Sequence, residues 1–442
     1  MQIRLSEHFN YKKLLKFTFP SIIMMVFTSI YGVVDGLFVS NLIGKTSFSA
    51  VNFVMPVLMI VGAVGFMFGA GGSAIVAKTM GEQDKEKANK LFSLFVYTAA
   101  VLGVILGVIT IIFLREIAVL LGAEGQMLED CVLYGRVVLI ALPFYVLQYL
   151  FQSFFITAEK PTLGLIVTVL SGVANMLFDA LFMAVFQWGL VGAALATGIS
   201  QAVGGIIPIF YFACSKTSIL KLTKCKYDGK AVLRATFNGS SELMSNISMS
   251  IVSMLYNIQL YKYAQVNGIA AYGVLMYVNF IFLAVYIGYS TGIAPVVGYH
   301  YGAGNCDELK NLKQKSFVII GIISVLMFGL SEVLGSPLSQ IFVGYDVELF
   351  EMTKRAFFLY SFSFLVVGIS IFGSCFFTAL NNGLISALIS FIRTLVLQVI
   401  SVFVFPLFWQ LDGIWLSIVF AEGMSAMITI VFLAINKKKY QY

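Results

Sequence analysis

Twelve apolar stretches dominate the chain, centred roughly on residues 27, 63, 102, 143, 174, 202, 247, 284, 323, 367, 396 and 424. A helix needs roughly 20 apolar residues to cross the hydrocarbon core of a bilayer. Hydrophobic residues make up 60% of the 442 residues and charged residues only 11%, whereas a soluble domain carries about 25% charged residues. We therefore predict an all-α polytopic membrane protein with twelve transmembrane helices and no sizeable soluble domain.

The basic residues divide unequally between the two sides of the predicted membrane. Threading the chain through twelve spans places 21 Lys and Arg on the side of both termini and 5 on the other side. Because an excess of Lys and Arg marks the cytoplasmic side, we expect a multi-pass protein of the plasma (inner) membrane with both termini in the cytoplasm. This distribution explains the net charge of +7 without a nucleic-acid partner. The polar N-terminal segment has no features of a cleavable signal peptide.

The sequence contains two related halves. Several pairs of residues share one offset of 221 positions: Gly71 and Gly292, Gly81 and Gly302, Thr157 and Thr378, Trp188 and Trp409, Gly192 and Gly413. We predict an N-lobe of six spans (1–214), a basic cytoplasmic loop (215–231) and a C-lobe of six spans (232–442). Because six is an even number, the two lobes should be related by an axis along the membrane normal, with a central cavity between them.

The two halves differ in where they place polar groups. At the shared offset Asn175 and Asp179 correspond to Val396 and Ile400, so this amide and carboxylate occur in one half only. An acid within a membrane costs about 2.5–3.5 kcal/mol on insertion scales. A shared scaffold explains what the halves have in common, whereas this difference favours a functional role.

Asp35, Asn175, Asp179 and Thr197 form the candidate cation-binding site. Asn175 and Asp179 are four residues apart and therefore share one helix face, and Asp35 and Thr197 should lie in the same outer part of the membrane. Their oxygens suit a hard cation such as Na⁺, and burial of a carboxyl group also favours proton binding. The alternative is that Asp179 only forms hydrogen bonds with its neighbours.

Three other charged residues lie in predicted spans. Glu242 is early in span seven and is a weaker candidate for attracting a cationic substrate or binding a proton. The alternative is a structural hydrogen bond or plain exposure at the membrane interface. Glu422 corresponds to Gln201 at the shared offset, which favours a structural hydrogen bond. Arg393 is expected to pair with an acid that the sequence does not identify. Pro20 removes a helix hydrogen bond fifteen residues before Asp35 and is a candidate hinge.

The order of these residues resembles the multidrug and toxic compound extrusion (MATE) transporters, and in particular their bacterial MepA-like branch. The resemblance rests on Pro20 and Asp35 in the first span, Gln152-x-Phe154-Phe155 with Ala158 and Pro161, and Asn175-x-x-x-Asp179. It implies export of organic cations or amphiphiles in exchange for H⁺ or Na⁺ by alternating access, without a cofactor. It also implies that Asp35, Asn175, Asp179 and Thr197 bind the coupling cation and that Tyr31 belongs beside them. We expect a monomer in the lipid bilayer.

Two other classes of function remain as alternatives. A flippase for lipid-linked precursors or other amphiphiles would have a similar build but a more cationic cavity. An enzyme is not expected, because the five cysteines and two histidines show no metal-ligand or catalytic spacing. The tenth span lacks the acid that some relatives carry there, so Glu242 is the main candidate in the second lobe.

Overall fold

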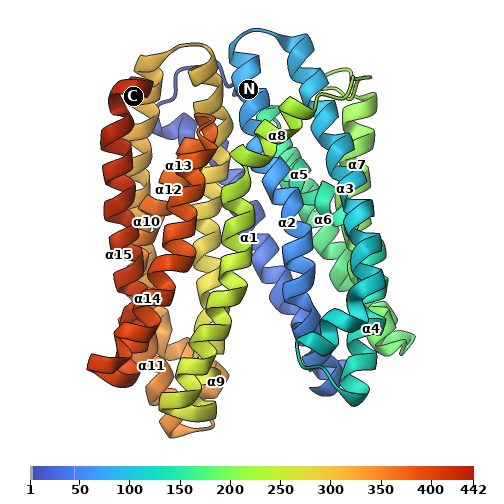
Figure 1. Cartoon of the computed structure of the whole chain (residues 1–442), viewed down its shortest axis with the longest axis vertical. Coiled ribbons are helices and arrows are strands. Elements are labelled where there is room, and N and C mark those ends of the chain that lie inside the picture. Colours follow the sequence, from blue (N-terminus) through green and yellow to red (C-terminus); the bar gives the residue numbers. More distant parts are fainter. Residues whose placement is uncertain (1–2, 44) are drawn as a thin grey trace.

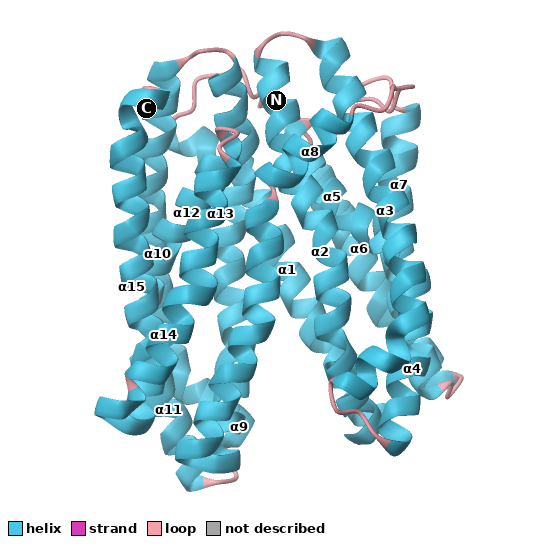
Figure 2. Cartoon of the chain, in the orientation of Figure 1, coloured by secondary structure: helices cyan, strands magenta, loops and turns pink. Residues whose placement is uncertain are grey.

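The computed structural model describes residues 3–43 and 45–442, which form helices joined by loops, with no strand among them (Figure 2). The first half contains α1 (Tyr11–Leu42), α2 (Lys45–Gly81), α3 (Lys85–Leu120), α4 (Gly125–Ile140), α5 (Leu142–Thr157), α6 (Pro161–Asp179), the π-helical segment η1 (Ala180–Val185) and α7 (Gly189–Cys214). The second half contains α8 (Gly229–Asn238), α9 (Ser240–Gly302), α10 (Cys306–Val343), α11 (Val347–Ser361), α12 (Phe364–Ala379), α13 (Gly383–Phe391), the π-helical segment η2 (Ile392–Val396), α14 (Leu397–Val404) and α15 (Pro406–Tyr440).

The helices account for all twelve predicted spans. Among the described residues, nine helices are long and apolar enough to cross a membrane, and two more crossings are bent pairs, α4 with α5 at 56° and α11 with α12 at 51°. One of the nine, α9, is a hairpin, because its backbone leaves the helical conformation at Gln265 and the rings of Tyr256 and Tyr272 stack 5.6 Å apart. In an unbroken helix sixteen residues would span about 24 Å. With α9 counted as two crossings, the predicted fold class is confirmed.

The helices form two bundles, which we call the N-lobe (α1–α7) and the C-lobe (α9–α15). Both chain termini lie at one end of the molecule, where the lobes approach each other, and the ribbons diverge toward the opposite end (Figure 1). The contact between lobes is made mainly by α1 and α2 of the N-lobe, which pack against α9 of the C-lobe.

Two glycines related by the sequence repeat bring the lobes together at the terminal end. A Cβ atom on Gly81 of α2 would lie 2.0 Å from the carbonyl oxygen of Tyr299, and one on Gly302 of α9 would lie 2.0 Å from the carbonyl oxygen of Lys78. Any side chain at either position would force the two helix backbones apart. The repeat therefore preserves a reciprocal contact between lobes as well as an internal packing pattern.

The N-terminal segment, residues 3–10, connects the two lobes at the same end. The Leu5 N–H donates to Glu159 Oε1 at 2.7 Å, in the loop between α5 and α6 of the N-lobe. The Phe9 N–H donates to Glu308 Oε1 at 2.9 Å, on α10 of the C-lobe, and His8 Nδ1 lies 2.6 Å from the second oxygen of the same carboxylate. Leu5 and Phe9 are fully buried, so this segment is part of the contact between the lobes.

Candidate cation-binding site

Three of the predicted site residues meet where α1 packs against α6. Asn175 and Asp179 lie one turn apart on α6, and Asp179 is its last residue, directly before η1. Asp35 of α1 interacts with both of them, and the three side chains are buried, with 6%, 2% and 0% exposure for Asp35, Asn175 and Asp179. A Cβ atom on Gly172 of α6 would lie 2.5 Å from the Phe27 ring, so the glycine allows α1 to approach this closely.

The oxygens of this cluster lack protein hydrogen-bond donors. Within the described residues, both oxygens of Asp179, one oxygen of Asp35 and the amide oxygen of Asn175 receive no hydrogen bond, although most buried polar side chains in proteins are hydrogen-bonded. Two ionised carboxylates about 4 Å apart would repel each other by about 4 kcal/mol at an effective dielectric constant of 20. The arrangement is therefore suited to a proton or a hard cation between the carboxyl groups.

Thr197 of α7 joins the cluster through a residue that the sequence analysis missed. The hydroxyl of Tyr134, on α4, lies beside the Thr197 hydroxyl and within electrostatic range of Asp35 and Asp179. Tyr134 is 1% exposed. The only signal in the sequence was one of several tyrosines in the fourth predicted span, and its spacing does not point to this cluster.

Tyr31 lies one turn from Asp35 on α1 but makes its direct contacts elsewhere. It interacts with Tyr149 and Gln148 of α5, and Asp35 lies within electrostatic range of its hydroxyl. The Gln148 amide donates to Ser171 Oγ at 3.2 Å on α6. Tyr31 is therefore part of a polar network of the N-lobe that the sequence did not reveal, and its role at the cation site stays a prediction.

The two remaining predicted residues lie away from the cluster. Pro20 is inside α1, which continues through it as one helix, and the next turn meets the C-lobe, where a Cβ atom on Gly288 would lie 2.6 Å from the Ile22 Cα. Glu242 is in the first turn of α9. Its charged neighbour is Arg393, so Glu242 belongs to a separate group in the C-lobe.

In the corresponding region of the C-lobe, the buried acid is paired with a protein cation. The single N–H of Arg393 Nε is shared between the two carboxylate oxygens of Glu422 on α15, at 3.1 and 2.8 Å, and this ion pair is largely buried. The sequence favoured a structural hydrogen bond for Glu422, and the structure supplies its partner. At the repeat offset Asp35 corresponds to Tyr256, whose hydroxyl lies 2.8 Å from both Gln398 Oε1 and Ser417 Oγ. Neutral groups thus replace the first aspartate in the C-lobe.

A known family model matches both halves of the chain. The MatE family model matches twice, at residues 20–181 and 243–404, once in each lobe. The chain belongs to the MatE family. The resemblance inferred from the sequence is therefore confirmed, and the two matched regions of the MatE model correspond to the two halves of the repeat.

Individual proteins with similar sequences or similar structures match this chain along nearly its whole length. The multidrug export protein MepA of Staphylococcus haemolyticus is 26% identical over 421 residues, which cover 95% of this chain and 92% of the relative. MepA of Staphylococcus aureus is 24% identical over 425 residues, covering 96% and 93%. A multidrug resistance MATE transporter solved in an outward-facing conformation has a TM-score of 0.93 and 21% identity, with coverage of 99% of this chain and 98% of that one. This likeness establishes the MatE fold.

Proposed function

We propose that this protein is a secondary active multidrug antiporter that exports organic cations or amphiphiles in exchange for H⁺ or Na⁺. The observation that carries the proposal is the pair of buried carboxyl groups, Asp35 and Asp179, whose oxygens lack protein donors. The names of the MepA relatives support the substrate class. Asn175 and Thr197 complete the set of oxygen ligands, and Tyr134 adds a hydroxyl beside them.

Cation binding at this site would change the charge between two helices. Without a cation, repulsion between Asp35 and Asp179 opposes the close packing of α1 on α6. A bound proton or Na⁺ removes that repulsion and favours the packed arrangement. A ligand shifts a conformational equilibrium only by its different affinity for the two states, and this site gives the cation such a difference.

The position of α1 offers a route from this site to the other lobe. Pro20 leaves the carbonyl of Lys16 without its usual helix donor, and the following turn of α1 contacts Gly288 of the C-lobe. A change in how α1 packs against α6 would therefore alter a contact between lobes. We propose Pro20 as the hinge of this movement and Glu242 as a secondary site for substrate or proton.

The state of the structure fits the outward-facing form. The lobes touch at the end that carries the termini, and the excess of Lys and Arg on that side supports a cytoplasmic location. The high TM-score with the outward-facing relative agrees with this orientation. In this state the drug leaves on the outer side and the cation enters from there.

Vesicle transport tests the proposal. Purified protein is reconstituted, and efflux of a fluorescent organic cation is measured under separately imposed Na⁺ and pH gradients. Asp35→Asn and Asp179→Asn should each abolish the response to the driving gradient, whereas Glu116→Gln, which removes an exposed acid on α3, should not. Undiminished gradient-driven efflux in both aspartate variants would falsify the coupling scheme.

The same preparation separates the antiporter from a flippase of lipid-linked precursors. An antiporter of this type should be protected against heat by soluble organic cations. Protection by a lipid-linked sugar, with none by organic cations, would instead assign the protein to the flippase class.

A further inference from the structure

The segment that joins the two lobes carries six exposed basic side chains: Lys216, Lys221, Lys224, Lys226, Lys230 and Arg234. It lies near the end of the molecule that carries the termini (Figure 1). None of the six forms an ion pair within the described part of the chain. The one acid among them, Asp228, caps α8 by accepting hydrogen bonds from the N–H groups of Lys230 and Ala231, at 3.0 and 3.2 Å. The segment therefore presents a dense and unpaired positive charge.

The loop before α8 is held in place on α3. The Lys221 N–H donates to Asn89 Oδ1 at 2.8 Å, and the Thr223 N–H donates to Ser93 Oγ at 2.8 Å. Leu220, the neighbour of Lys221 in the chain, is 1% exposed. A basic loop that only sets the orientation of the chain in the membrane needs charge but no such fixed structure. The anchoring of this loop therefore indicates a further role for its charge.

The exposed face of α8 is amphipathic. The face that packs on the protein consists of Ala231, Ala235 and Asn238, all buried. Lys230 and Arg234 are one turn apart, as are Leu233 and Phe237, so the two pairs form adjacent stripes on one face of the helix. Both basic residues are exposed, and Leu233 and Phe237 are 56% and 64% exposed. The helix thus offers positive charge and apolar surface side by side.

α8 lies at the junction of the two lobes. It packs against α2 and α3 of the N-lobe and against α13 of the C-lobe. A Cβ atom on Gly71 of α2 would lie 2.2 Å from the carbonyl oxygen of Ala235. The Asn238 amide donates to the carbonyl oxygens of Gly71 in the N-lobe and Thr378 in the C-lobe, at 3.3 and 3.0 Å. The amphipathic face therefore has a fixed position between the lobes.

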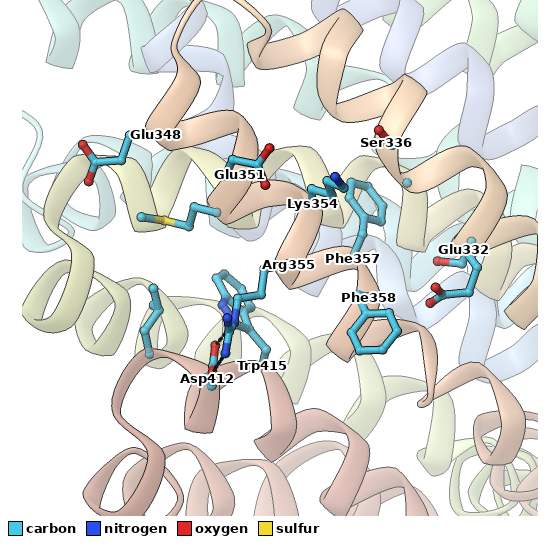
Figure 3. A pocket seen from close by; sticks show the side chains of 14 residues that line it. Glu332, Ser336, Glu348, Glu351, Lys354, Arg355, Phe357, Phe358, Asp412 and Trp415 are labelled. Carbon is cyan, nitrogen blue, oxygen red and sulfur yellow. Dashed lines mark hydrogen bonds and ion pairs between the residues drawn. The ribbon is translucent and has the colours of Figure 1, made fainter.

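The opposite end of the C-lobe has the reverse charge. A pocket there, between α10, α11 and α15, is lined by the carboxylates of Glu332, Glu348 and Glu351 (Figure 3). Arg355, which also lines this pocket, is paired with Asp412, and Lys354 is the other cation of the lining. Carboxylates repel anionic headgroups, so the two ends of the molecule differ in how they contact a lipid surface.

We propose that α8 and the loop before it bind the headgroups of anionic phospholipids in the leaflet nearest the termini. Clusters of basic residues next to a membrane span attract anionic lipids, and an amphipathic helix with apolar and basic residues lies in the membrane interface. Lys230 and Arg234 contact the lipid phosphates, and Leu233 and Phe237 lie among the adjoining acyl chains. The inference goes beyond the proposed transport function and does not depend on it, because these contacts involve neither the cation cluster nor the exported compound.

Quenching by brominated lipids tests the proposal in nanodiscs. In the full-length protein, Trp188→Phe with Trp409→Phe leaves only Trp415, which is fully buried and supplies a constant background. Phe237→Trp then adds a reporter on α8. The discs contain equal amounts of phosphatidylglycerol and phosphatidylcholine, with bromine on the acyl chains of one lipid or the other, so that the two quenching values give a relative affinity. Phosphatidylglycerol should be preferred by about fivefold, which corresponds to about 1 kcal/mol.

Charge variants connect this preference to α8. Lys230→Gln with Arg234→Gln should bring the ratio of affinities close to one. The matched control, Lys85→Gln with Lys87→Gln, removes two exposed charges from the first turn of α3 at the same end of the molecule and should keep the preference. An equal loss in this control would assign the effect to net charge and overturn the proposal. So would a preference that survives in the α8 variant.

A reporter at the opposite end tests the location. Trp409 precedes Asp412 by three residues and is 55% exposed. Retained in place of the reporter on α8, it should show no preference for phosphatidylglycerol. The same preference at both ends, or no quenching of the α8 reporter by either lipid, refutes the proposal.

A soluble competitor separates a lipid contact from a plain phosphate site. Glycerol phosphate, compared with chloride at matched ionic strength, should leave the preference at the α8 reporter unchanged, because it has no acyl chains to place beside Leu233 and Phe237. If it removes the preference, the segment binds a phosphate group alone and the proposed contact with the membrane surface is wrong.

Discussion

Glu308→Ala should weaken the docking of the N-terminal segment on the two lobes. In the native protein the Glu308 carboxylate accepts hydrogen bonds from the Phe9 N–H at 2.9 Å and from Asn311 Nδ2 at 2.8 Å, and it pairs with His8. The bond between Asn311 and Glu308 lies within α10. The Phe9 carbonyl has donors of its own, Asn311 Nδ2 at 3.0 Å and Lys315 Nζ at 2.8 Å, and these bonds persist in the variant. A buried bond to a charged group contributes about 1.5–3 kcal/mol, and the pair with His8, which is 70% exposed, adds at most about 1 kcal/mol. Docking should therefore weaken by about 2–4 kcal/mol.

Hydrogen exchange at the Leu5 amide measures this weakening at a distance. Leu5 is bonded to Glu159 of the other lobe, so its own acceptor is intact in Glu308→Ala. A loss of about 2–4 kcal/mol should accelerate exchange there between roughly thirtyfold and several hundredfold, if the segment opens as one unit. Glu308→Gln keeps an acceptor for the Phe9 N–H and should show a smaller effect. Unchanged protection of Leu5 in Glu308→Ala would refute the idea that residues 3–10 connect the lobes cooperatively.

Three other outcomes follow from the same structure. Burial raises the pKa of Glu159, so its contribution to docking is present at low pH and is lost as the pH rises through that raised pKa; Glu159→Gln should remove this pH dependence of exchange in the N-terminal segment. Breaking the buried Arg393–Glu422 pair with Arg393→Met should cost about 3–5 kcal/mol, and adding Glu422→Met should restore most of the melting temperature lost in the single variant. Asp35→Asn and Asp179→Asn remove one repelling carboxylate each, so both should raise the melting temperature in the absence of Na⁺ at alkaline pH, and a lowered value in both would contradict the repulsion.

The sequence predicted those features that depend on local periodicity. The twelve spans follow from apolar length, and the shared face of Asn175 and Asp179 follows from their spacing of four residues. The repeat offset also identified Gly81 and Gly302 as equivalent positions. Each of these inferences needs only the geometry of a single helix or a comparison of the chain with itself.

Partners on different helices were beyond the sequence. Tyr134 is on α4 and Thr197 is on α7, and their hydroxyls meet through the packing of these two helices. Arg393 lies in η2, and its partner Glu422 lies on α15, so the sequence alone did not identify this pair. The contact of Phe9 with Glu308 joins residues almost 300 positions apart. Such contacts depend on how helices rotate and bend during packing, and hydropathy carries no information about either.

The two lobes contrast in how they satisfy their buried polar groups. In the C-lobe, Arg393 neutralises Glu422 and the Tyr256 hydroxyl has partners on two helices, so packing there does not depend on an added cation. In the N-lobe, Asp35 and Asp179 face each other with no cationic side chain beside them among the described residues, so in the proposed mechanism the packing of α1 would depend on what binds between them. Since α1 also contacts α9, the proposal predicts that a change in occupancy alters the boundary between the lobes. A protein with paired acids in both lobes would not respond to the cation. A protein with unpaired acids in both lobes would need two cations to pack. The difference between the lobes therefore limits the response to one site.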